Sequence, residues 1–180
     1  MTAIELLLQR QSTPFLISPA PSGEALEQIL AAGMRVPDHA CLQPWYFTVI
    51  TDNGLQRLSD LFVVSSDKEN IELEKIAKKP FRAPMVIVIS TQYCAHEKVP
   101  LQEQLITAGC CAHAMQMAAF CLGYGAVWRT GGFAYNEQIK QGLGIAEQDD
   151  LVGFLYIGTP GREQVLKPTK SFDHKVSYWK

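Results

Sequence analysis

Residues Met85–Thr91 read MVIVIST, a nearly continuous apolar run that predicts a β-strand buried on both faces. Two further stretches have a similar character: Leu151–Gly158 reads LVGFLYIG, and Trp45–Ile50 reads WYFTVI. Ala126–Thr130 completes the set of predicted strands. The sequence therefore predicts strands spread along the chain rather than gathered in one part of it.

Helical patterns fill the intervals between these strands. Ser22 is placed to cap a helix that runs through Met34, and Pro37 stops that helix. The predicted helices cover Ala3–Gln11, the stretch from Ser22 to Met34, Leu55 to Lys79, Leu101–Gly123 and Asn136–Leu143. Helices that alternate with strands over the whole length indicate the α+β class. No repeat, low-complexity segment or long linker interrupts the pattern, so we expect one domain over residues 1–180.

The composition is that of an ordinary globular chain: 47% of the 180 residues are hydrophobic, 19% are charged, and the formal net charge is -2. This balance argues against disorder and against an electrostatic surface for nucleic acid or an anionic membrane. The basic pair Lys78-Lys79 is interpreted as part of a solvated face. The first residues, MTAIE, lack the positive region and cleavage site of a signal peptide, so we expect a cytoplasmic protein.

The five cysteines are then expected to be reduced thiols. Cys110 and Cys111 are adjacent, and no CxxC or CxxH spacing occurs. We therefore expect neither a disulfide framework nor a metal site. The simplest interpretation of the cysteines is small buried hydrophobic side chains.

The stretch Leu105–Leu122, LITAGCCAHAMQMAAFCL, is long enough to raise the question of a membrane span. It contains Thr107, His113 and Gln116, its small residues dilute its hydrophobicity, and no cluster of Lys or Arg flanks it. A helix that is apolar on nearly every face is better explained as a central core helix or a subunit-interface helix. His113 is either a ligand or, as we favour, a hydrogen-bonded core histidine.

Four short stretches could carry chemistry: RQS at residues 10–12, RVPDH at 35–39, QPW at 43–45 and WRTGG at 128–132. An arginine beside a hydroxyl suits a phosphate, and a glycine turn lets the backbone approach a ligand. Each stretch also has a structural interpretation, such as a salt-bridged turn or a rigid strand start. The chain has no GxGxxG, GxxxxGK[ST] or GxSxG motif, so neither a Rossmann site, a P-loop nor a nucleophile elbow is indicated.

Taken together and in order, these stretches resemble the nitroreductase family, in particular its small, short-chain branch. The matching text is IELLLQRQS, AGMRVPDHACLQPWYFTVI, KPFRAPMVIVI, AGCCAHAMQMAAFCLGYGAVWRTG and LVGFLYIGTP. The resemblance covers nearly the whole chain. It implies a mixed sheet between helical layers and an intertwined homodimer that binds one FMN in each half of its interface.

The resemblance also implies roles for particular residues, carried over by matching position. Arg10 and Ser12 would hold the phosphate and ribityl end of FMN, with Gln11 between them. Arg35 and His39 would reach the flavin from the partner subunit. The family often has arginines where this chain has residues 11 and 14, so one phosphate contact is either missing or supplied by a lysine of the C-terminal tail, Lys167 or Lys170.

Further contacts follow from the same resemblance. Gln43 is a possible additional flavin contact, and Trp128, Arg129 and Thr130 would line the flavin within the same chain. One stretch matches a segment that the family associates with the nicotinamide nucleotide, although a buried helix end would explain it equally well: Ala118, Ala119, Phe120, Cys121, Leu122 and Gly123.

The implied function is an FMN-dependent oxidoreductase that takes reducing equivalents from NADH or NADPH. It would pass them to a nitroaromatic, a quinone or a similar electron-poor acceptor by a ping-pong mechanism. The flavin N5 would carry the chemistry, so no side chain is expected to act as nucleophile or general base. Positive groups such as Arg35 or His39 could stabilise charge that develops on the ring or on the acceptor. The alternatives are a flavoenzyme of the same fold with another specific reaction, a flavin-binding or storage protein, and an interaction domain without a cofactor.

Overall fold

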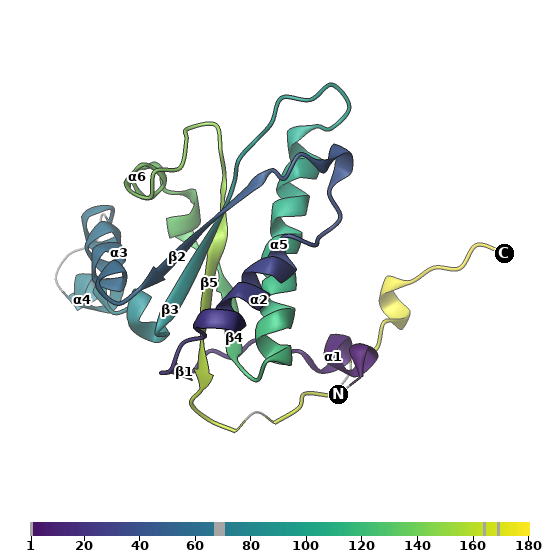
Figure 1. Cartoon of the computed structure of the whole chain (residues 1–180), viewed down its shortest axis with the longest axis horizontal. Helices are drawn as coiled ribbons and strands as arrows, with labels where there is room; N and C mark the ends of the chain where they lie inside the picture. The colour runs from purple at the N-terminus through teal and green to yellow at the C-terminus, as the bar shows by residue number, and fades with distance from the viewer. Residues whose placement is uncertain (1, 67–70, 164, 169) are drawn as a thin grey trace.

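The computed structural model describes residues 2–66, 71–163, 165–168 and 170–180. Its centre is a sheet built from β1 (Leu16–Ile17), β2 (Trp45–Thr51), β3 (Met85–Thr91), β4 (Gly125–Arg129) and β5 (Leu151–Pro160). The strand order is β1-β5-β3-β2, and β4 also pairs with β5 (Figure 1). Each pairing found between these strands is antiparallel. The long strand β5 therefore has β3 along one side and β4 followed by β1 along the other.

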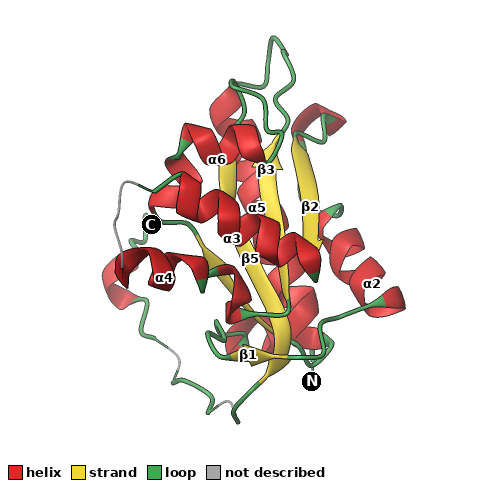
Figure 2. Ribbon diagram, turned by 90° about the vertical axis from the view of Figure 1, so that its left-hand side faces the viewer, coloured by secondary structure: helices red, strands yellow, loops and turns green. Residues whose placement is uncertain are grey.

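Helices cover both faces of this sheet. They are α1 (Ala3–Gln9), α2 (Gly23–Gly33), α3 (Asn53–Val64), α4 (Ile71–Ala77), α5 (Leu101–Cys121) and α6 (Glu137–Gly142). Short 3-10 turns lie at His39–Cys41, Pro80–Arg82, Gly132–Tyr135 and Asp173–Lys175. Helices α3, α4 and α6 lie over one face, and α2 and α5 lie over the other (Figure 2). The α+β class and the two helical layers are confirmed.

Strand β3 shows why the sheet lies at the centre of the fold. All seven of its side chains are buried. Val86 and Val88 pack in the core on the α3 side, whereas Ile87 and Ile89 pack in the core on the α5 side. Because successive side chains of a strand point to opposite faces, a strand between two helical layers is apolar at every position. The predicted burial of this strand on both faces is confirmed.

Two elements differ from the sequence-based expectation. The helical stretch predicted from Leu55 to Lys79 is divided into α3 and α4, and residues 67–70 of that prediction lie outside the described residues. Strand β1 was not predicted, because a pair of residues is too short to show an alternation of polar and apolar side chains. Ser22 does occupy the N-cap of α2, but its side chain makes no capping hydrogen bond.

Helix α5 has a buried face and an exposed face. Its inner face includes Ala108, Ala112 and Met115, which are fully buried against the sheet and α2. Its outer face includes Ile106, which is 60% exposed, and His113, which is also exposed. The interpretation of His113 as a core histidine is therefore wrong for the isolated chain, because the helical spacing places it with Ile106 on the outer face. Among the described residues, no helix is long and apolar enough to cross a membrane.

The cysteines also differ from expectation. Only Cys111 is buried, whereas Cys41, Cys110 and Cys121 are exposed and Cys94 is half-buried. Burial raises the pKa of the Cys111 thiol to about 12, and among the cysteines this residue alone is the predicted small buried side chain. Cys110 is exposed and the adjacent Cys111 is buried because the two side chains point to different sides of α5.

Gln104 anchors the loop between β3 and α5. Its side chain is 1% exposed and accepts a hydrogen bond from the Cys94 N–H at 2.9 Å. Its amide also donates to the carbonyl groups of Cys94 at 2.8 Å and Val99 at 3.1 Å. One side chain on the first turns of α5 therefore satisfies three backbone groups of the loop that follows β3.

Gln104→Met is expected to lower the free energy of unfolding by about 1–3 kcal/mol, because an isosteric apolar side chain leaves backbone groups unpaired. Urea unfolding followed by circular dichroism measures the change. Gln102→Met is the matched control, because Gln102 is exposed on the same helix. Equal unfolding midpoints for the two variants would show that the loop does not depend on this amide.

Candidate functional site

The segment after α1 places Ser12 against β4 and α5. The Thr13 N–H donates to the Ala126 carbonyl at 2.9 Å, so the segment lies beside the start of β4. From α5, the Gln116 side chain donates to the Ser12 hydroxyl at 3.5 Å and to the Ala126 carbonyl at 3.1 Å. No role was predicted for Gln116, although a polar side chain within an otherwise apolar helical stretch was the available signal.

Arg10 carries a polar atom that is buried and not satisfied. Its Nη1 has no hydrogen-bond partner among the described residues. Leaving a guanidinium nitrogen out of water without an acceptor costs free energy. A phosphate oxygen is an acceptor whose charge and geometry match such a fork. The residues present therefore fit an anionic group next to Arg10 and Ser12.

The C-terminal tail comes back to this segment. The Gln11 amide donates to the Val165 carbonyl at 3.1 Å. Gln11, Ser12, Pro14 and Lys167 line one hollow of about 230 Å³. The sequence left open whether Lys167 or Lys170 lies near the first motif. The structure brings Lys167 to the hollow, and Lys170 is not among the residues that line it.

Strand β4 separates two of the expected flavin contacts. The Trp128 indole lies on the α5 side, where its Nε1 donates to the Val152 carbonyl at 3.3 Å and its ring lies next to Gly109. The Arg129 guanidinium lies on the opposite face, 5.9 Å from the centre of the Tyr156 ring. Alternation along a strand explains this division. Thr130 is exposed at the strand end and leads into Gly131, whose φ of 74° forms the predicted glycine turn.

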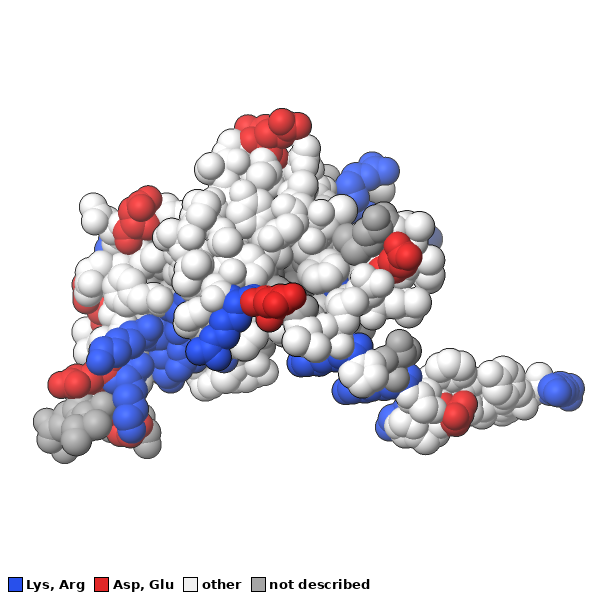
Figure 3. Space-filling view, turned by 90° about the horizontal axis from the view of Figure 1, so that it is seen from below, with Lys and Arg blue, Asp and Glu red and all other residues white. Residues whose placement is uncertain are grey.

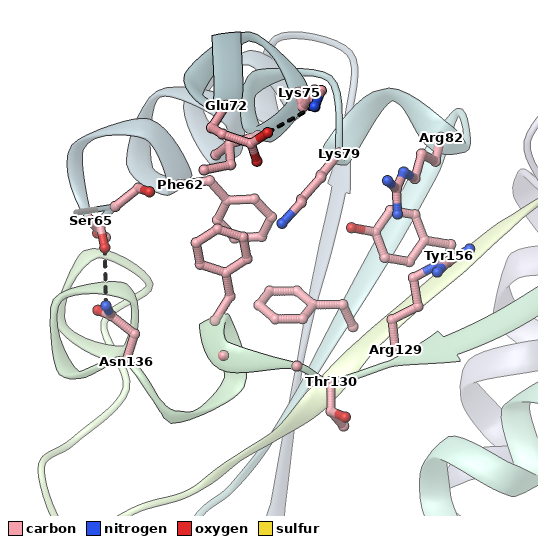
Figure 4. Close-up of a pocket in the computed structure, with 16 residues that line it drawn as sticks. Phe62, Ser65, Glu72, Lys75, Lys79, Arg82, Arg129, Thr130, Asn136 and Tyr156 are labelled. Carbon is pink, nitrogen blue, oxygen red and sulfur yellow. Dashed lines mark hydrogen bonds and ion pairs between the residues drawn. The ribbon is translucent and has the colours of Figure 1, made fainter. Parts of the chain in front are cut away.

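A cavity of about 840 Å³ opens on the Arg129 side of β4 (Figure 4). Arg129 and Thr130 line it together with Lys79 and Arg82. Lys78 is exposed as predicted, but the solvated-face interpretation is wrong for Lys79, which is half-buried with its Nζ 4.4 Å from the centre of the Phe133 ring. Burial first, and then the charge of Arg82, lowers the pKa of Lys79. A pair of adjacent lysines gave no signal that one of them points inward.

Arg35, His39 and Gln43 lie in the loop between α2 and β2. Arg35 is exposed, and the His39 Nδ1 lies 3.1 Å from the Glu103 Oε2 at the start of α5. The Gln43 N–H donates to the Asp38 carboxylate at 2.7 Å. The interpretation of this loop as a capped, salt-bridged turn fits the contact of Asp38 with Gln43, whereas His39 contacts Glu103 of α5 rather than a side chain of the loop.

The loop with His39 and the segment with Ser12 lie toward opposite ends of α5 (Figure 1). Their contacts on the helix, Glu103 and Gln116, are separated by a rise of about 20 Å at 1.5 Å per residue. One chain therefore does not bring the two groups of expected flavin contacts together.

The segment from Ala118 to Gly123 forms the last turn of α5 and the bend after it. Ala119 is buried, as a helix-end interpretation requires. Phe120 and Gly123 instead line a hollow of about 350 Å³ together with Arg162 of the tail. The segment thus contributes both to the core and to an open surface.

Comparison with known sequences defines the family of this chain. The model of the "Nitroreductase family" matches residues 7–159, and the chain belongs to this family. It is 43% identical over 163 residues to "Putative NAD(P)H nitroreductase YdjA" of Escherichia coli K12, which covers 89% of each chain. It is 36% identical over 179 residues to "Putative NAD(P)H nitroreductase" of Haemophilus influenzae, which covers 97% of each chain.

Solved structures share the fold at lower sequence identity. A nitroreductase-like family protein from Bacillus cereus superposes with a TM-score of 0.88 at 22% identity, covering 100% of this chain and 97% of that one. A nitroreductase with bound FMN from Bacteroides fragilis superposes with a TM-score of 0.74 at 18% identity, covering 98% of each chain. At these identities the likeness shows the fold alone.

Proposed function

We propose that residues 1–180 form one FMN-binding domain, and that the protein uses NADH or NADPH to reduce a nitroaromatic, a quinone or a similar electron-poor acceptor. The observation that carries the proposal is the buried, unsatisfied Nη1 of Arg10, two residues before Ser12 in the segment beside β4. The names of the two bacterial relatives and the FMN-bound neighbour from Bacteroides fragilis support the same cofactor and donor.

FMN would lie along β4 with its phosphate at Arg10, Ser12 and Lys167. The strand rises by about 13 Å from Ala126, which contacts the first motif, to Thr130 at the glycine turn. An elongated ligand with a phosphate at one end and a ring at the other could lie along this length of β4. Trp128 offers an aromatic surface for the ring on the α5 side of the strand.

The second half of the site would come from a partner subunit. The halfway point between Glu103 and Gln116 on α5 lies at Gly109 and Cys110, where the helix is partly or fully exposed. A two-fold pairing of α5 helices about this point would set the His39 end of one chain beside the Ser12 end of the other. The exposed apolar side chains around α5 and α1 support an interface here: Ile4, Leu7, Leu8, Leu105 and Ile106.

The tail supports an intertwined form of this dimer. Its apolar side chains have little to pack against within the chain, and Trp179 is 97% exposed. Strand β2 lies at the end of the strand order, so one of its edges has no partner among the described residues. We propose that the tail crosses onto the partner subunit, because burial of these aromatic and aliphatic side chains there would stabilise the pair.

Bound FMN would supply the two-electron chemistry by accepting hydride at N5 and passing electrons onward. The chain would bind and orient the ring through the Trp128 surface and the Thr130 turn. Arg35 and His39 would place positive charge where negative charge develops during reduction. Donor and acceptor would occupy the same position in turn, which gives ping-pong kinetics. The segment from Ala118 to Gly123 would contribute to binding the nicotinamide nucleotide.

The visible spectrum of the purified protein tests this proposal first. We expect flavin absorption, release of FMN on denaturation, and oxidation of NADH or NADPH that depends on an added nitroaromatic or quinone. A yellow protein that oxidises neither nucleotide would instead be a flavin-binding or storage protein. A protein that stays colourless after incubation with FMN would end the proposal.

His39→Ala is expected to weaken FMN binding or slow flavin reduction by about three- to tenfold, because one interaction with the ring is lost. Titration of the apoprotein with FMN and single-turnover reduction by NADPH measure the two effects. His96→Ala serves as the control, because His96 is an exposed histidine outside the proposed site. Unchanged binding together with unchanged turnover would remove His39 from the site.

A further inference from the structure

The cavity of about 840 Å³ between the α3–α4 layer and the sheet is not explained by the proposed FMN position. FMN would lie on the Trp128 side of β4, whereas Arg129 points into the cavity on the other side. The two spaces meet at the turn formed by Thr130 and Gly131, which lines the cavity and would border the flavin ring. The cavity is large enough for a small organic ligand.

Positive charge is concentrated at this cavity. Lys79, Arg82 and Arg129 line it, and none of the three forms an ion pair within the described parts of the chain. Lys75 also lines it but already pairs with Glu72 at 2.8 Å. Figure 3 shows Lys and Arg side chains gathered on the side of the molecule where α4 lies. Three cations without a paired carboxylate favour an anion.

Two polar atoms at the cavity also lack partners. The Ser65 hydroxyl belongs to a residue that is only 7% exposed, and it has no hydrogen-bond partner among the described residues. The Arg129 Nε is likewise buried and without a partner in the described structure. Buried polar groups are nearly always satisfied, so these atoms indicate a ligand or ordered water in the cavity. Burial, and then the charge of Arg82, lowers the pKa of Lys79, and the Glu72 carboxylate partly offsets this; a bound anion would act in the same direction as Glu72.

The remaining walls are aromatic. Phe62 and Phe133 stack with their centres 4.3 Å apart and their planes at 7°. The Tyr156 ring lies between Arg82 and Arg129, and its hydroxyl points into the cavity (Figure 4). Flat rings are well accommodated by such walls, and guanidinium groups hold carboxylates at their edge.

We infer that this cavity selects the acceptor, and that the acceptor is a flat aromatic compound carrying a carboxylate or another anionic group. The inference rests on the proposed function. The anionic group would lie among Lys79, Arg82 and Arg129, with the Ser65 hydroxyl as a further donor. The electron-poor end of the acceptor would reach the Thr130 turn, where the flavin ring is proposed to lie.

The test compares two probes of nearly the same shape, 4-nitrobenzoate and neutral 4-nitrobenzamide. We expect wild-type kcat/KM to favour the benzoate by about tenfold, which is the size of one charge-assisted hydrogen bond. Arg82→Gln should bring the ratio close to one. Arg57→Gln is the matched control, because this exposed arginine on α3 lines a different hollow. Calorimetric titration with benzoate, which is not reduced, should show the same tenfold loss of affinity in Arg82→Gln only.

The outcomes separate this inference from the proposed function. Equal kcat/KM for the two nitro compounds, or unchanged benzoate affinity in Arg82→Gln, overturns the inference while leaving an active flavoenzyme. A protein that does not bind FMN on incubation overturns the proposed function, yet titration of that protein with benzoate still tests whether the cavity binds an anion. If Arg82→Gln raises KM for NADPH but not for NADH or 4-nitrobenzoate, the cavity serves the phosphate of the donor and the acceptor assignment fails.

Discussion

Arg10→Ala is expected to weaken FMN binding by about ten- to a hundredfold, the largest loss of affinity that we predict for a single side chain. The Arg10 Nη1 is buried without an acceptor in the described structure, so a phosphate oxygen would gain a charge-assisted hydrogen bond at little cost in reorganisation. The chain has Gln11 and Pro14 where the family resemblance would suggest further arginines, so Arg10 would carry more of the proposed phosphate binding.

Quenching of free FMN fluorescence during titration of the apoprotein measures the dissociation constant of each variant. Arg57→Ala removes an exposed arginine from α3 and should leave the affinity unchanged. A dissociation constant for Arg10→Ala within twofold of the wild-type value would show that the phosphate lies elsewhere. Inorganic phosphate should also compete with FMN in the wild type and compete less in Arg10→Ala.

Ile106→Glu is expected to convert the proposed dimer to a monomer and to abolish retention of FMN. Ile106 is 60% exposed on the outer face of α5, so the fold of one chain tolerates a carboxylate there. Ile106 lies about 5 Å along α5 from the proposed two-fold point at 1.5 Å per residue, so the substitution would bury an unpaired carboxylate in each half of the interface, which is strongly unfavourable. Without the partner, Arg35 and His39 would remain near the far end of α5 and could not cover the flavin.

Size-exclusion chromatography with light scattering gives the mass, and absorbance gives the FMN content of the same fractions. Val64→Glu introduces the same change at an exposed apolar position on α3 and should keep both the dimer and the cofactor. A dimeric Ile106→Glu protein with a full complement of FMN would contradict the proposed interface. Circular dichroism of both variants confirms that each remains folded.

The sequence predicted the sheet well because burial on both faces leaves a continuous apolar run, as in β3. It could not predict β1, which is too short to show periodicity, or the burial of one lysine in the pair Lys78-Lys79. His113 was misassigned because a helix that is apolar all round does not reveal from sequence which face stays exposed in one chain.

The candidate site was predictable as a set of segments but not as an arrangement. The RQS and WRTG stretches were identified through their residue types and the family resemblance, and the structure sets the first of them beside β4. Alternation along the predicted strand Ala126–Thr130 already implied that Trp128 and Arg129 point to opposite faces, but the family resemblance grouped both residues as flavin contacts. The cavity beyond Arg129 depends on side chains from α3, α4, β4 and β5, which meet only through tertiary packing.

Helix α5 carries Gln116, which holds Ser12, on its inner side and Ile106 on its outer side. Dimerisation and FMN binding should therefore be thermodynamically linked, because the same helix contributes to both. Diluting the protein should release flavin, and adding flavin should strengthen self-association by the same factor. The yellow colour of a solution would then vary with protein concentration as well as with the supply of FMN.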